Sequence, residues 1–534
     1  MKKLVSLLLA LVMVLTAACF ASAEEGAFAE TVTIRIPVYD RGVQGCPDVE
    51  NNYWTQWVNE QFGAKYNVKV EFVGITRSDV LTDYSLLAAD KNLPTVLMEY
   101  DYDKVSLWAN EGYLQTIDLT DFAEVAPLFY SKMVENNQLV YTQLNDKTYF
   151  VLAERPYFNT DYTFQTFVRM DWLEQVGYDY VPVKYDEWCD AMDKIMEAGL
   201  AEHPAGGHKV AGAGVDQNYK YRTYPFSEEE WAKYSYITTT SLGSAADYAL
   251  LKRENHNYNV GYTDPEYYLT DAETEKANFI AGKCYSYAGY ISGNMDWLNS
   301  FYANNPDAKL AISPVMLEID EASDGIVTTP AYRANNPFGM TIGFAADATE
   351  DELKAAWLYM DWLLQPENLF TFQWGFEGEN FNYNAAGMAE SVANYEGEFK
   401  QGYNNNKDYW CIVIEARAAG TIEQTVDATS PVGLPQTFNA DILKFYYDRV
   451  EAAKDGWAIS DPLVSVTIAS ENEYKQELIN LYTEYRDKLT MCAEEEFDAL
   501  YEELTQKYLD AGYQLIIDER LAAYENGNTT KMPK

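Results

Sequence analysis

Hydrophobic and polar positions in the first hundred residues follow two patterns, one with the two-residue period of β-strands and one with the wider spacing of amphipathic helices. These patterns predict strands at 30–39, 67–73 and 95–99, separated by helices at 51–66 and 78–90. A β-α-β-α-β order is typical of a parallel sheet covered by helices. Because ligands of such sheets bind beyond the carboxyl ends of the strands, the loops 39–43 and 100–103 are candidate binding loops.

The rest of the chain continues this mixed pattern and then becomes mainly helical. Further strands are predicted at 148–153, 163–169, the end of 278–290, 309–316 and 339–345, and a long helix at 350–364. Two apolar stripes at helical spacing follow near the C-terminus: Leu478, Leu481, Tyr482, Tyr485 and Leu489, then Phe497, Leu500, Tyr501, Leu504 and Tyr508. No repeat or Ser-, Gly- or Pro-rich linker separates modules, so the pattern favours an α/β protein whose parts are intertwined.

The N-terminus carries the features of an export signal. Lys2 and Lys3 precede an apolar run at 4–15 that is short for a membrane span, and the motif Ala-Ser-Ala at 21–23 resembles a cleavage site. Residues 1–23 are therefore a predicted signal peptide, and the mature chain is expected to be secreted. An alternative stays open, in which Cys19 is lipidated and tethers the protein to the cell surface.

Charge and composition exclude several classes of function. The formal net charge of −44 repels nucleic acid and anionic membranes, and no nucleic-acid motif is present. The chain lacks a G-x-x-x-x-G-K-[ST] phosphate-binding loop and has only three histidines, which argues against ATP hydrolysis and against a Ser-His-Asp triad. His203 and His208 lie in a Gly-rich segment typical of a surface loop. No metal or other cofactor is predicted.

The cysteines that would remain after signal cleavage are widely spaced and odd in number, without C-x-x-C spacing. They are Cys46, Cys189, Cys284, Cys411 and Cys492. Isolated thiols are the expected state, although one disulfide stays open as an alternative.

The segment 168–188, VRMDWLEQVGYDYVPVKYDEW, predicts the end of a strand, a short helix, a turn and a second helix. Asp171 is expected to cap the first helix, while Asp186 and Glu187 place negative charge in the first turn of the second. The segment resembles the R-x-D-W-L-x-x-x-G … P-x-x-x-D-E-W block of the family 1 extracellular solute-binding proteins of ABC importers. Two later segments, 374–383 and 497–524, are similar to further blocks of that family, in the same order.

This resemblance implies a two-lobed periplasmic-binding-protein-like fold, in which hinge strands join the lobes and a ligand cleft lies between them. We expect lobe 1 to comprise 30–152 and about 318–375, lobe 2 to comprise 153–317 and about 376–480, and C-terminal helices at 481–534 to pack on the lobes. Crossings between lobes are expected near 148–156 and 309–333. Some relatives bind calcium after the D-E-W helix, but the matching residues 196–215 lack consecutive Asp or Asn ligands, which argues against a calcium site there.

Aromatic side chains are the main positive signal for a ligand, because a sugar presents an apolar face to a ring while its hydroxyls need polar partners. Clusters that combine rings with polar groups occur in loops at strand ends, and Arg169 ends a predicted strand near a crossing. The candidate ligand-binding residues are Tyr39, Asp40, Arg41, Tyr100, Asp101, Tyr102, Arg169, Tyr290, Asn294, Trp297, Trp374 and Glu379.

The favoured interpretation is a non-enzymatic receptor that captures a carbohydrate, expected to be an oligosaccharide, by hinge closure and delivers it to the permease of an ABC importer. A monomer is expected. One alternative is a receptor for a peptide or another non-sugar solute. The other is a secreted glycan-degrading enzyme. Glu377 and Glu379 give this alternative little support, because two carboxylates on one short segment do not face each other across a scissile bond.

Overall fold

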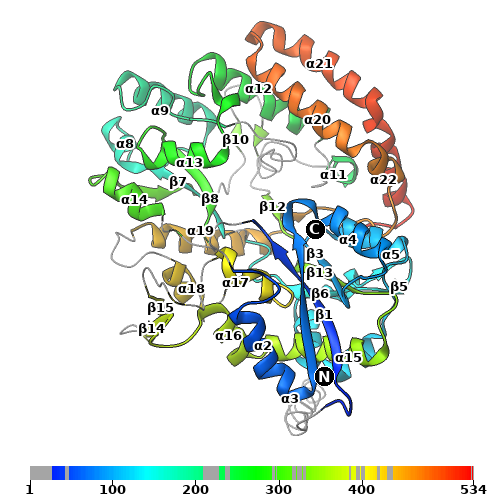
Figure 1. Ribbon diagram of the computed structural model, residues 1–534. Helices are drawn as coiled ribbons and strands as arrows, with labels where there is room; N and C mark the ends of the chain where they lie inside the picture. Colours follow the sequence, from blue (N-terminus) through cyan, green and yellow to red (C-terminus); the bar gives the residue numbers. More distant parts are fainter. Residues whose placement is uncertain are drawn as a thin grey trace, which may run out of the picture.

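Two α/β lobes and a layer of C-terminal helices make up the protein, seen in a computed structural model (Figure 1). The structure describes residues 27–42, 47–160, 162–208, 228–234, 241–291, 295, 297–314, 320–321, 327–328, 332–383, 387–392, 397, 403–417, 421–429, 437–530 and 532. The predicted signal peptide, Cys19, Cys46 and Asn294 lie outside these residues.

The first lobe is built on strands from distant parts of the chain. Strand β1 (Val32–Asp40) runs parallel to β2 (Val68–Thr76), as the sequence predicts. Strand β3 (Val96–Glu99), however, pairs with β13 (Phe338–Phe344) in antiparallel orientation, and β6 (Val151–Glu154) pairs with the other edge of β13. The prediction of one parallel ladder through the first three strands is therefore wrong at β3, because its partner comes from a segment over 200 residues later.

Helices with strong N-terminal caps cover these strands. In α2 (Tyr53–Val58) Asn52 and Thr55 form a capping box, and in α15 (Glu350–Leu364) Thr349 and Glu352 form another. The indole of Trp54 stacks on Phe372 of α16 (Pro366–Trp374), with ring centroids 4.9 Å apart. Residues 409–414, which the sequence assigns to the second lobe, belong to this same hydrophobic core.

The second lobe has a three-stranded antiparallel sheet with β7 (Phe164–Arg169) in the centre, between β8 (Ser286–Tyr290) and β9 (Leu310–Ile312). The helices of this lobe lie around the sheet (Figure 1). They are α8 (Met170–Gln175), α9 (Tyr185–Glu197), α13 (Ala272–Ile280), α14 (Trp297–Asn304), α18 (Ile422–Thr429) and α19 (Thr437–Lys454).

The segment 168–188 forms part of the framework of this lobe. Asp186 and Glu187 lie in the first turn of α9 as predicted. Asp171 does not cap α8: its carboxylate instead accepts two hydrogen bonds from the Arg169 guanidinium, at 2.9 and 2.7 Å. The prediction of a cap is wrong because a nearby cation offers this carboxylate a stronger, bidentate partner.

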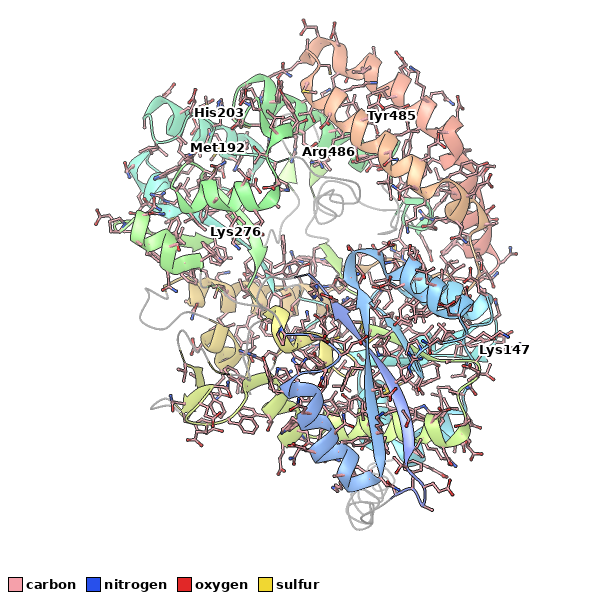
Figure 2. The ribbon with its side chains drawn as sticks, viewed as in Figure 1. Lys147, Met192, His203, Lys276, Tyr485 and Arg486 are labelled. Atoms are coloured by element: carbon pink, nitrogen blue, oxygen red, sulfur yellow. The ribbon has the colours of Figure 1, made fainter. Side chains whose placement is uncertain are left out.

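The C-terminal helices form a third layer (Figure 1), in which α20 (Ala469–Met491) packs on α12 (Ala245–Asn259) and on α21 (Phe497–Tyr508). A π-helical turn at Leu509–Tyr513 leads into α22 (Gln514–Glu525). The predicted stripe residues Leu478, Tyr482, Tyr485 and Leu489 are buried in the core of this layer. Arg486 lies where α20 meets α12 (Figure 2), and its guanidinium forms a bidentate ion pair with Glu254.

Helix α20 is linked to both lobes through its neighbours. Helix α12, its partner at one end, packs on α9 of the second lobe through Arg253, whose guanidinium lies 4.4 Å from the Tyr185 ring, and through the Tyr185–Asn257 hydrogen bond. At the other end Thr467, just before α20, accepts a hydrogen bond from Asn110 of α5 (Tyr102–Asn110) in the first lobe.

Several segments pass between the lobes. The chain leaves β6 at Glu154 and enters β7 at Phe164, and the Glu154 backbone also pairs with 413–415. Strand β12 (Tyr332–Ala334) precedes β13 and pairs in parallel with β16 (Ala458–Ser460).

The remaining elements are α3 (Ala64–Tyr66), α4 (Val80–Ala89), α6 (Leu119–Val125), α7 (Pro127–Glu135), β4 (Gln143–Leu144), β5 (Lys147–Thr148), α11 (Glu228–Tyr234), β10 (Asp320–Glu321), β11 (Val327–Thr328), β14 (Phe381–Tyr383), β15 (Ala389–Ser391) and α17 (Tyr403–Trp410). No helix in the part of the chain that the structure describes is long and apolar enough to span a bilayer.

Candidate ligand-binding site

A cavity of about 670 Å³ lies at the junction of the two lobes. One part of its wall comes from residues that directly follow the first three strands: Arg41 after β1, Arg77 after β2 and residues 99–104 at the end of β3. This is the edge at which ligands of such sheets bind. The cavity volume lies within the usual range of small-molecule sites, roughly 300–1,000 Å³.

The segments that pass between the lobes supply most of the remaining wall. They contribute residues 155–158, 334–336, 415–416 and 461–463. Tyr290, at the end of β8, is the second lobe's contribution from its sheet, and 68% of its surface is exposed. A ligand in this cavity would therefore touch both lobes and the connections between them.

Two of the cavity's cations are held by bidentate ion pairs with carboxylates. Arg41 donates from Nε and Nη2 to the two carboxylate oxygens of Asp408, both at 2.8 Å. Arg155 binds Glu415 through Nε and, at 3.0 Å, through Nη2. Glu415 lies on a different crossing segment from Arg155, so this pair ties two connections together.

Glu99 places a buried carboxylate in the cavity wall. It is 1% exposed, and it accepts hydrogen bonds from the Tyr39 hydroxyl at 3.1 Å and from the Tyr100 backbone N–H at 2.9 Å. Arg77 and Lys104 approach the same carboxylate at 3.7 and 3.9 Å. A buried charge needs such compensation, and here two cations share it.

Asp101 and Asp103 begin α5 at the rim of the cavity, and Asp101 caps the helix by accepting a hydrogen bond from the Asp103 N–H. Burial raises the pKa of Asp101, with a further contribution from Glu99 that Lys475 and Lys104 oppose. Burial, then Asp101 and Glu471, raise the pKa of Asp103 well above its usual range, against the effect of Arg520 and Lys475. The charges of α20 and α22 therefore act on carboxyl groups of the cavity rim.

Of the twelve residues predicted to bind ligand, the structure brings five to the cavity: Arg41, Tyr100, Asp101, Tyr102 and Tyr290. Tyr39 is buried behind the wall, where its hydroxyl donates to Glu99. Asp40 is exposed and accepts a hydrogen bond from the Gly42 N–H.

The other predicted residues lie elsewhere. Arg169 is 6% exposed, pairs with Asp171, and lies 4.4 Å from the Trp172 ring. Trp297 packs in the second-lobe core, 5.1 Å from Phe167. Trp374 is buried in a small separate cluster, and Glu379 is exposed in a turn after it. Asn294 is outside the described residues.

The sequence interpretation missed the cavity residues Arg77, Lys104, Arg155, Lys407, Glu415 and Asp461. Arg77 could have been found, since it follows β2 as Arg41 follows β1. Glu415 and Asp461 carry no such signal, because they reach the cavity only through pairings with strands far away in the sequence.

Among the residues that the structure describes, no group of three or more His, Cys, Asp and Glu side chains is placed so that it could hold a metal ion. His203 Nδ1 contacts the Gly261 carbonyl at 2.8 Å, and His208 pairs with Glu275 at 2.7 Å. Cys189, Cys284, Cys411 and Cys492 are free thiols.

Residues 48–369 match the family model of the bacterial extracellular solute-binding proteins. The chain belongs to this family. Solute-binding proteins of this family are the extracellular receptors of ABC importers, and they bind their solute without catalysis. No curated protein matches this solute-binding protein in sequence.

Solved structures agree with the fold of this solute-binding protein. It is similar to the alginate-binding protein AlgQ2 (TM-score 0.62, 14% identity, covering 94% of this chain and 99% of that one). It is also similar to an extracellular solute-binding protein from Bifidobacterium longum subsp. infantis (0.61, 13%, 92% and 98%). A third similar structure is the N-glycan transport solute-binding protein from Streptococcus pneumoniae (0.56, 13%, 92% and 100%). These likenesses establish the two-lobed fold.

Proposed function

We propose that this solute-binding protein captures an oligosaccharide in the cavity between its lobes and delivers it to the permease of an ABC importer. The observation that carries the proposal is the composition of the cavity wall, where the aromatic residues Tyr100, Tyr102, Tyr157, Phe158 and Tyr290 alternate with charged and amide side chains. Rings can stack on the apolar faces of sugars, and the polar groups can bind their hydroxyls.

Tyr290 is the clearest stacking surface. Its ring is supported edge-to-face by Phe164, with centroids 5.0 Å apart, yet most of its own surface stays exposed at the cavity. A supported but exposed ring has already lost much of its conformational freedom, so a sugar that stacks on it gains contact area at low entropic cost.

We infer that the two lobes close over the ligand before it is delivered to the permease. The crossing segments 155–158, 334–336, 415–416 and 461–463 line the cavity, so a ligand that binds there contacts the elements about which the lobes would rotate. We assign each segment to the lobe whose hydrophobic core it joins, so residues 409–414 belong to the first lobe. Similar structures include an alginate-binding protein, an N-glycan transport protein and a solute-binding protein in complex with kestose, and these ligands belong to the same class of solute.

The test is a thermal-shift screen of the mature protein against neutral oligosaccharides, acidic oligosaccharides and peptides, followed by titration calorimetry. Ligand at 100 times its Kd is expected to stabilise the folded state by about 2.7 kcal/mol. Tyr290→Ala should weaken saccharide binding, whereas Tyr383→Ala, which removes an exposed tyrosine outside the cavity wall, should not.

Two outcomes would overturn the proposal. Stabilisation by peptides but by no saccharide would assign the cavity to another solute. Release of shortened products from a bound glycan by the purified protein would contradict a receptor role.

A further inference from the structure

Four cations of the cavity wall, Arg41, Arg77, Lys104 and Arg155, fall into two kinds. Arg41 and Arg155 are engaged by carboxylates in bidentate pairs, which occupy the face of each guanidinium that could grip a ligand. Arg77 and Lys104 face their carboxylates only at 3.7 and 3.9 Å, beyond hydrogen-bond distance. The N–H donors of Arg77 and Lys104 can therefore bind a ligand.

Arg77 is held in place chiefly by aromatic rings. Its guanidinium carbon lies 5.0 Å from the centre of the Tyr39 ring and 5.8 Å from that of Tyr100, and the two rings are 6.4 Å apart. Such cation–π contacts act through the flat faces of the guanidinium and leave its N–H groups, which point outward in the plane, unused. Arg77 donates no hydrogen bond to any residue that the structure describes, and its side chain is 33% exposed.

The position of Glu99 explains why this arrangement is stable. Its buried carboxylate attracts Arg77, and the Tyr39 hydroxyl that donates to Glu99 belongs to one of the two rings against which Arg77 lies. Glu99, Tyr39 and Tyr100 thus fix the direction of Arg77 without using its donors. A planar donor fork fixed in this way loses little entropy when it binds a planar pair of oxygens.

Arg77 and Lys104 place two positive charges at this corner of the cavity, where they face the carboxylates of Glu99 and Asp101. Glu99 lies 3.7 Å from Arg77 and 3.9 Å from Lys104, and Asp101 lies 3.9 Å from Lys104. The protein's overall negative charge acts over longer distances, where salt screens it within about 10 Å.

We propose that Arg77 is a specificity-determining residue that binds a carboxylate of the ligand, so that the cavity selects an acidic oligosaccharide, one that carries a uronic-acid or sialic-acid unit, over its neutral counterpart. Lys104 adds a second positive charge beside the same carboxylate. Tyr39 and Glu99 are positioning residues, which act on the ligand only through Arg77. The inference rests on the proposed function and names the chemical class of saccharide.

The experiment compares matched pairs of probes by titration calorimetry on the mature protein: trigalacturonate with galactotriose, and 3′-sialyllactose with lactose. At least one acidic probe should bind, and it should bind about 10- to 100-fold more tightly than its neutral match, the range expected for a charge-assisted bidentate contact. Its affinity should fall as NaCl is raised.

Variants of Arg77 locate the effect. Arg77→Gln should lose this advantage and flatten the salt dependence, while it leaves the affinity for the neutral probe within about threefold. Arg77→Lys keeps the charge but lacks the planar fork, so it should recover only part of the difference. Lys69→Gln, which removes an exposed cation from β2, the strand that precedes Arg77, should behave as the unmodified protein. Melting temperatures identify any variant that fails to fold, in which case Arg77→Lys carries the test.

The outcomes separate this inference from the proposed function. Equal or tighter binding of the neutral probes, or an Arg77→Gln variant that binds the acidic probe as the unmodified protein does, would overturn the role of Arg77 while saccharide binding stands. Binding of peptides in place of every saccharide would overturn both.

Discussion

Gly512 offers the sharpest test of how the C-terminal layer is packed. It lies in the π-helical turn between α21 and α22 with φ +116° and ψ −9°, a backbone conformation that residues with a Cβ rarely adopt. A Cβ built there would lie 2.5 Å from Cγ of Tyr474 on α20, which is far closer than atoms can approach. Gly512→Ala therefore combines backbone strain with a steric clash.

The two costs can be separated with a second glycine. Strain at a positive φ costs about 1–2 kcal/mol, and overpacking in a well-packed core adds about 1–3 kcal/mol, so Gly512→Ala should destabilise the layer by about 2–5 kcal/mol. Gly527 also has a positive φ, +75°, but nothing lies within 4 Å of a Cβ built on it. Gly527→Ala should therefore cost only the strain, about 1–2 kcal/mol.

Urea unfolding followed by circular dichroism measures the global change, and hydrogen exchange in α21 and α22 measures the local change, since a protein of several parts need not unfold in one step. Removing the obstructing ring with Tyr474→Ala in the Gly512→Ala background should recover the steric part, and the double-mutant cycle gives its size. Equal destabilisation by Gly512→Ala and Gly527→Ala, or no recovery when Tyr474 is removed, would refute the reasoning.

Three further predictions follow from buried groups. Glu471→Gln removes the carboxylate charge that lies 3.1 Å from the fully buried Arg520 and should cost about 3–5 kcal/mol in urea unfolding; a loss below about 1 kcal/mol would contradict it. Burial raises the pKa of Asp103 above the usual 3.8, so the stability that this group contributes in its protonated form is lost as pH rises through the raised pKa and is regained on acidification. Asp103→Asn should therefore be more stable than the unmodified protein near neutral pH, and its stability should depend less on pH. Parallel pH profiles of melting temperature for the two proteins would count against this. Burial raises the pKa of the Cys189 and Cys284 thiols from 9.0 to about 11. In the folded protein both thiols should therefore react with Ellman's reagent near pH 8 about 100-fold more slowly than in denaturant. Rapid labelling of the folded protein would contradict this prediction.

Local patterns in the sequence predicted the elements well, because each depends on neighbours in the chain. The helix at 350–364 has the predicted bounds, since Thr349 and Glu352 fix its start within four residues of sequence. The strand-end rule located Arg41 and the 100–102 loop at the cavity, and it applies equally to Arg77.

What the sequence could not supply were the long-range partners. Strand β3 meets β13 across more than 200 residues, and Glu415 reaches the cavity because its backbone N–H donates to the Glu154 carbonyl. Trp297 packs against Phe167 of β7, which lies far away in the sequence. Trp374 is covered by two nearby rings, Phe370 of its own helix and Phe381 of β14, and by the distant guanidinium of Arg417 at 4.3 Å. An exposed ring such as Tyr290 differs from a buried one only through tertiary packing.

The attachment of α20 at both ends also limits how the protein can move. The segment that leads into it is fastened to α5 of the first lobe through Asn110 and Thr467, and its other end is fastened to α12 through Glu254 and Arg486. An α-helix of 23 residues is about 35 Å long and does not stretch, so α20 holds the two attachments at a fixed distance from each other. The lobe closure proposed above would then have to keep these two attachments at a constant separation, or break one of them.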